Sequence, residues 1–94
     1  MTDLLSVFLR VRELIARPDN DFFWSSWRDA PHALEEIDEI IATLRAGEMP
    51  DRLQMRVLFA PTGPIQEVSL SSGWGDEFIE LAKAFDAATT SAPR

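Results

Sequence analysis

The residue types that could carry catalysis are few, and their spacing does not match a catalytic motif. The chain has one histidine, His32, and no cysteine. Its serines lie outside a Gly-x-Ser-x-Gly nucleophile elbow. His32 follows Asp29 by three residues, a spacing that helix capping explains better than a catalytic pair. Thiol nucleophiles and thiolate metal sites are excluded, and we predict that the protein is not an enzyme.

Carboxylates are abundant, but their pattern predicts neither a metal site nor a cofactor site. The run Asp19-Asn20-Asp21 lacks the following glycine and the distant glutamate of an EF-hand loop. The glycine-containing segment 72–75 precedes an expected helix, but it has neither the P-loop spacing nor a lysine or arginine nearby in the sequence. We therefore expect no metal, no cofactor and no phosphate site.

Large aromatic side chains are concentrated between Asp19 and Asp29, and two interpretations of them remain open. One is that they fill the gap between two helices, as large aromatic residues commonly do in small cores. The other is that some stay exposed and anchor a partner, because aromatic residues are enriched at protein interfaces. The candidate anchors are Phe22, Trp24 and Trp27.

Four acidic residues are clustered on one expected helix: Glu35, Glu36, Asp38 and Glu39. A solvated helix face is the common reason for such a cluster. The alternative is a docking patch that steers a basic partner by long-range attraction.

The composition of the chain argues against some classes of partner and indicates a cellular compartment. A net charge of −7 works against binding to nucleic acid or to anionic membranes. No run approaches the ~20 apolar residues that span a bilayer. The N-terminal segment also lacks the basic start and the unbroken apolar run of a signal peptide. Because disulfides are impossible without cysteine, we expect a cytoplasmic protein.

The elements that would position these residues form one small domain over residues 1–94. Three- and four-residue spacing of apolar side chains predicts helices at 2–17, 30–46 and 76–88, with a frayed tail at 89–94. Thr2 or Asp3 caps the first helix and Asp29 the second. Alternating apolar residues predict strands at 53–59 and 65–70, joined by a turn at 60–64. The expected class is α+β, in the order α-α-β-β-α.

Three functions are compatible with these observations. The first is a small acidic protein-interaction domain, for example an inhibitor or immunity-type protein that occludes a basic toxin or enzyme. The second is a small-molecule-binding or sensory domain with an aromatic-lined pocket formed by Trp24, Trp27, Phe59 and Trp74. The third is a self-associating structural domain, a homodimer formed through the first helix or a free strand edge.

Overall fold

The computed structural model describes residues 3–61 and 63–90, and this part of the chain contains five helices and no strand. The helices are α1 (Leu4–Ile15), α2 (Ala30–Arg45), α3 (Arg52–Phe59), α4 (Pro64–Ser72) and α5 (Gly75–Thr90). The expected α+β class with a β-hairpin is therefore wrong. The described residues form an all-helical fold.

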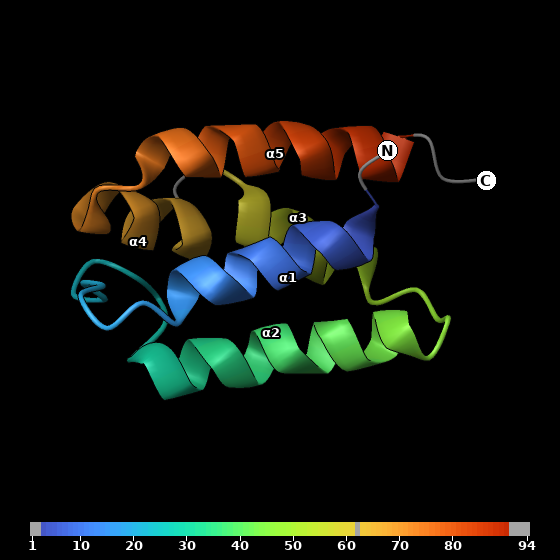
Figure 1. Ribbon diagram of the computed structural model, residues 1–94, viewed down its shortest axis with the longest axis horizontal. Helices are drawn as coiled ribbons and strands as arrows, with labels where there is room; N and C mark the ends of the chain where they lie inside the picture. The colour runs from blue at the N-terminus through green and yellow to red at the C-terminus, as the bar shows by residue number, and fades with distance from the viewer. Residues whose placement is uncertain (1–2, 62, 91–94) are drawn as a thin grey trace.

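Helix α1 lies at the centre of the fold (Figure 1). It contacts α2 on one side and α5 on the other, and it runs antiparallel to both. Helix α3 lies behind α1 in this view, and α4 contacts both α3 and α5. The arrangement buries the apolar stripe of α1, so the first helix offers little free apolar surface for the dimer contact weighed from the sequence.

The ends of α1 and α2 follow the local signals in the sequence. The Asp3 carboxylate accepts a hydrogen bond from the Ser6 amide at 2.8 Å, and this bond lowers the pKa of Asp3. The Asp29 carboxylate caps α2 in the same way, accepting from the His32 amide at 2.9 Å. Past the end of α2, Gly47 adopts a φ of 79°, a conformation that favours glycine. Both caps are confirmed, while Thr2 lies outside the described residues.

The last helix is longer than its sequence pattern predicted. Helix α5 begins at Gly75 and continues through Thr90, so it includes the first two residues of the tail that we expected to fray. The Thr89 hydroxyl donates to the Phe85 carbonyl at 2.9 Å, one turn back in the helix. Residues 91–94, the rest of the expected tail, lie outside the described part of the chain.

The segment expected to form the first strand forms helix α3 instead. Its apolar residues lie on two faces of this helix rather than on one face of a strand. Met55, Leu58 and Phe59 have the three- and four-residue spacing of a helix, and all three are buried. The other members of the alternating series, Leu53 and Val57, point to solvent. The Asp51 carboxylate accepts hydrogen bonds from the amides of residues 53 and 54, so an N-cap signal opens this segment.

The second expected strand is helix α4. Pro64 occupies its first turn, where the missing proline amide would have no helical partner in any case. Ile65 and Val68 are fully buried one turn apart, whereas Leu70, which a strand would place beside Val68, is exposed. Gly73 closes the helix with a φ of 85°. Short apolar segments fit either period, and burial against the other helices decides between them.

Gly63 lets the connection between α3 and α4 turn tightly, and its replacement tests this packing. A Cβ atom at this position would lie 2.5 Å from the Val57 carbonyl oxygen and 2.9 Å from that of Ala60. Because both are backbone atoms, we expect Gly63→Ala to lower the free energy of unfolding by ~1–3 kcal/mol in chemical denaturation.

The matched control for this substitution is Gly75→Ala. The nearest atom to a Cβ there is the tip of the exposed Leu70 side chain, at 3.2 Å, and this tip can move away. We expect little change in stability from the control. Equal losses for the two variants would contradict the close approach at Gly63.

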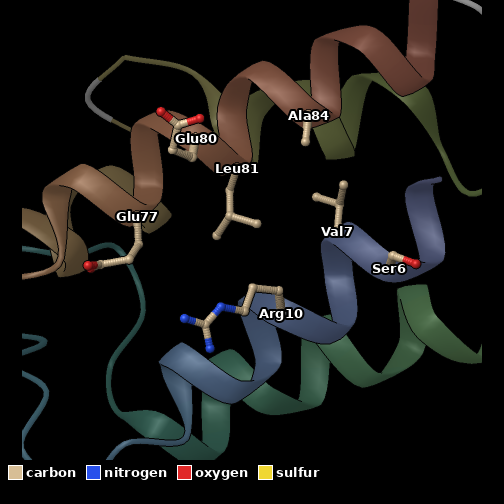
Figure 2. A pocket seen from close by; sticks show the side chains of 7 residues that line it. All are labelled: Ser6, Val7, Arg10, Glu77, Glu80, Leu81 and Ala84. Atoms are coloured by element: carbon tan, nitrogen blue, oxygen red, sulfur yellow. The ribbon is translucent and has the colours of Figure 1, made fainter. Parts of the chain in front are cut away.

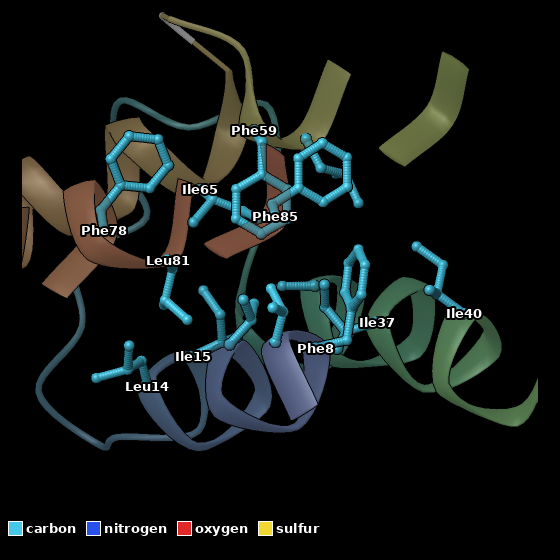
Figure 3. Packing of buried hydrophobic residues seen from close by; sticks show 14 of the residues in the cluster. Phe8, Leu14, Ile15, Ile37, Ile40, Phe59, Ile65, Phe78, Leu81 and Phe85 are labelled. Atoms are coloured by element: carbon cyan, nitrogen blue, oxygen red, sulfur yellow. The ribbon is translucent and has the colours of Figure 1, made fainter. Parts of the chain in front are cut away.

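Four phenylalanine rings join α1, α3 and α5 in the core (Figure 3). The Phe59 ring stacks on Phe85 with centroids 4.4 Å apart and an interplanar angle of 13°. It also stacks on Phe78 at 6.3 Å and meets the edge of Phe8 at 5.7 Å. Phe59 is 8% exposed, so the ring that the sequence offered for a ligand pocket is part of this core cluster.

Candidate functional site

Residues 16–29, which join α1 to α2 and which we call the aromatic loop, present two large rings to solvent. Phe23 is 78% exposed and Trp24 is 68% exposed. Their rings meet edge to face, with centroids 4.9 Å apart and an interplanar angle of 85°. An exposed pair of this kind is uncommon on a small protein with a buried core, so these two rings are the candidate site.

The start of the aromatic loop is tied to the fold by Asn20. Its side-chain amide donates to the carbonyls of Leu14 and Ile15 at 2.7 and 2.9 Å, which satisfies the last turn of α1. Its side-chain oxygen accepts from the indole nitrogen of Trp74 at 2.8 Å. Trp74 is 2% exposed, so Asn20 gives a buried donor its partner.

The middle of the loop is held against α4. The Asp21 amide donates to the Ser72 hydroxyl at 2.8 Å, and the Ser25 hydroxyl donates to the Pro64 carbonyl at 3.4 Å. Within the loop, the Phe23 amide donates to the Asp21 carboxylate at 2.9 Å. The exposed rings are attached to this part of the backbone, which these bonds fix to both ends of α4.

The end of the loop is tied to α2 and α3 through Glu36. Trp27 is 3% exposed, and its indole nitrogen donates to one carboxylate oxygen of Glu36 at 2.9 Å. The other oxygen accepts from the Gln54 side chain at 2.9 Å. The aromatic loop is therefore held at its start, middle and end, with Phe23 and Trp24 between the fixed points.

The aromatic residues selected from the sequence have three different placements. Trp24 is exposed, Trp27 is buried, and Phe22 is partly buried against the core. Phe23, which sequence reasoning left out, is the most exposed of the loop's four rings. No local signal separates Phe22 from Phe23, because the direction of each side chain depends on how the loop is held.

The acidic residues of α2 divide into two pairs. Glu36 holds Trp27 and Gln54, and the Asp38 carboxylate accepts from the guanidinium of Arg12 at 2.6 Å. This ion pair raises the pKa of Arg12. Glu35 and Glu39 are exposed and have no ion pair within residues 3–61 and 63–90. Glu35 and Glu39 are therefore the two carboxylates of this cluster that no described side chain engages.

The four residues considered for an aromatic pocket do not share one environment. Trp27 and Trp74 are buried with hydrogen-bond partners on different segments, and Phe59 lies in the phenylalanine cluster. Trp24 is on the surface. The structure therefore places three of these side chains in the core and one in solvent.

A groove with a volume of about 390 Å³ lies between α1 and α5. Val7 and Leu81 line it, with Arg10 on the α1 side and Glu77 on the α5 side (Figure 2). The remaining lining residues are Ser6, Glu80 and Ala84. Its size is within the range of small-molecule sites, and none of the four aromatic candidates lines it.

Within residues 3–61 and 63–90, no group of three or more histidine, cysteine, aspartate or glutamate side chains is placed to hold a metal ion. Among the same residues, no helix combines the length and the apolar character needed to cross a bilayer.

Comparison with known proteins gives no functional information. No protein-family model matches the chain, and no curated protein or solved structure resembles it significantly. The candidate site therefore depends on the geometry of the aromatic loop alone.

Proposed function

We propose that this protein is a non-enzymatic protein-interaction domain that binds its partner through the aromatic loop. The observation that carries the proposal is the exposed edge-to-face pair of Phe23 and Trp24 on a loop held at three points. Exposing this much apolar surface to water is unfavourable, and burial by a partner would remove the penalty.

The hydrogen bonds on either side of the rings support this proposal. A loop that is already fixed loses little conformational entropy when a partner binds, so more of the contact energy contributes to affinity. The ties at Asn20, Asp21 and Glu36 hold the backbone while both rings remain free of the core. Rigid aromatic side chains are also the residues most often found as interface hot spots.

Charge favours a basic partner. The chain carries −7 overall, and Glu35 and Glu39 are exposed without an ion pair in the described residues. Complementary charge increases the association rate and discriminates against acidic partners. The mechanism is occlusion of a basic surface, as an inhibitor or immunity-type protein would act, in the cytoplasmic compartment that the cysteine-free sequence favours.

Affinity capture from native cell lysate, at low and moderate salt, tests the proposal. We expect the unmodified chain to retain a basic protein that is lost with a Phe23→Ala/Trp24→Ala variant. With the purified partner, this double substitution should weaken binding by about thirtyfold or more, because hot-spot truncations cost ~2 kcal/mol or more. Its thermal unfolding should be nearly unchanged, since both side chains are exposed.

The matched control is Leu70→Ala/Ile79→Ala. These residues are 68% and 52% exposed, lie on α4 and α5 rather than on the aromatic loop, and take no part in the hydrogen bonds that hold the loop. The control should retain the partner. Equal retention by the loop variant, equal loss in both variants, or no captured protein at all would each contradict the proposal.

Small-molecule binding is a second candidate, favoured by the α1–α5 groove rather than by the aromatic residues. The apolar side chains of Val7 and Leu81 lie between a cation, Arg10, and a carboxylate, Glu77. A compact ligand with an apolar body and charges of both signs would match this lining. Stabilisation by such ligands in a thermal-shift screen, lost in Arg10→Ala, whose side chain is exposed, would favour this function.

A further inference from the structure

A second exposed apolar surface lies on α3 and on the residue that leads into it. Met49, Leu53 and Val57 are 47%, 68% and 53% exposed, and we call them the α3 stripe. Among residues 3–61 and 63–90 they account for three of the seven exposed large hydrophobic residues, and all three fall within nine residues of sequence. Leu53 and Val57 are four residues apart, so they lie on the same face of the helix.

The core does not explain the α3 stripe. Helix α3 already buries Met55, Leu58 and Phe59 on its inner side. An eight-residue helix with a second apolar face leaves that face unpaired in the isolated chain. Single exposed apolar residues are normal on proteins, but two large ones on one helix face, with a third three residues before the helix, are a candidate binding surface.

Two arginines line one edge of the stripe. Arg52 and Arg56 are four residues apart, both are exposed, and neither forms an ion pair with any residue the structure describes. The one carboxylate between residues 49 and 60 is Asp51, which already accepts from two amides at the start of α3. This edge of α3 therefore carries two positive charges that no described carboxylate pairs, whereas Gln54 beside the stripe bonds Glu36 of α2.

We propose that the α3 stripe binds an acidic amphipathic segment of a partner protein. The apolar side of such a segment would cover Leu53 and Val57, and its carboxylates would meet the free guanidinium groups of Arg52 and Arg56. This surface differs from the aromatic loop in the sign of its charge, so the proposal goes beyond the function given above and does not depend on it.

Two other occupants fit the charges less well. A second copy of the chain also carries a net charge of −7. In a contact between two α3 helices, the arginines of one copy would face the arginines of the other, and the one carboxylate of the segment is already engaged in capping the helix. An anionic membrane is a poorer match, because lipid-binding clusters commonly use about four to eight basic residues. Only two arginines, Arg52 and Arg56, line the α3 stripe.

Binding of two synthetic peptides, followed by NMR of the labelled full chain, tests the proposal. One peptide is an amphipathic helix of leucine and glutamate, and the other replaces each glutamate with lysine. We expect the glutamate peptide to shift the methyl signals of Met49, Leu53 and Val57 and to bind about tenfold or more tightly than the lysine peptide. Its affinity should fall as salt is added.

Substitutions on α3 make the test specific. Leu53→Ser/Val57→Ser should abolish binding of the glutamate peptide, and Arg52→Glu/Arg56→Glu should reverse the preference toward the lysine peptide. If the charge reversal unfolds the chain, the salt dependence and the serine variant still decide. Phe23→Ala/Trp24→Ala should leave peptide binding unchanged, so failure here is separate from failure at the aromatic loop.

Three results would overturn the proposal. The first is equal binding of the two peptides, and the second is peptide shifts that map away from α3. The third is a lack of response to the glutamate peptide while the methyl signals of the α3 stripe shift for another reason. That reason would be self-association of the chain, detected by sedimentation, or the addition of anionic phosphatidylserine vesicles.

Discussion

Replacing Phe59 with alanine should lower the free energy of unfolding by ~3–5 kcal/mol, the usual range for a buried phenylalanine. The ring contacts Phe8, Phe78 and Phe85, so its removal opens a cavity where α1, α3 and α5 meet. Small domains are stable by only ~5–15 kcal/mol. Denaturant unfolding followed by circular dichroism should therefore show a markedly lower midpoint.

Leu53→Ala is the matched control for this prediction, and the pair also tests the fold itself. In a strand, Leu53 and Phe59 would share one face and both would be buried or both exposed. In α3 they differ, because Leu53 is 68% exposed and Phe59 is 8% exposed. We expect the control to change stability by less than ~0.5 kcal/mol. A comparable loss in both variants would contradict the helical assignment.

Asn20→Ala should lower the free energy of unfolding by ~2–4 kcal/mol. The substitution removes three hydrogen bonds at once, two to the carbonyls of Leu14 and Ile15 and one from the indole of Trp74. Trp74 is buried, so its N–H would lose its partner without gaining water, and an unsatisfied buried donor costs ~1–3 kcal/mol. Urea unfolding of the variant measures the loss.

Asp19→Ala is the control for Asn20→Ala, because Asp19 is the exposed neighbour in the same loop. A double-mutant cycle with Trp74→Phe isolates the bond between the two side chains. We expect Asn20→Ala to be less destabilising in the Trp74→Phe background. Strictly additive losses would show that Asn20 acts only through α1. Faster amide exchange at Phe23 and Trp24 in Asn20→Ala would connect this tie to the preorganisation of the aromatic loop.

Local sequence signals were sufficient to predict the first two helices and most of the last helix. Asp3 and Asp29 cap helices where the sequence predicts them, and Gly47 lies just past the end of α2. These signals act between residues at most four apart, so they operate without the rest of the fold. The absence of cysteine, the single histidine and the net charge of −7 are likewise properties of the sequence alone.

The tertiary structure decided the state of residues 52–72 and the exposure of each aromatic ring. Apolar residues two apart in 53–59 fit a strand, and the same residues fit two faces of a short helix, so local preference left the choice open. Contacts with the other helices settle it. The positions of the loop's aromatic rings depend on two long-range hydrogen bonds. Asp21 bonds Ser72, which is 51 positions later in the sequence, and Asn20 bonds Trp74, which is 54 positions later. Such pairings form only when the chain folds. For this reason the sequence-based prediction selected Trp27 as an anchor and left out Phe23.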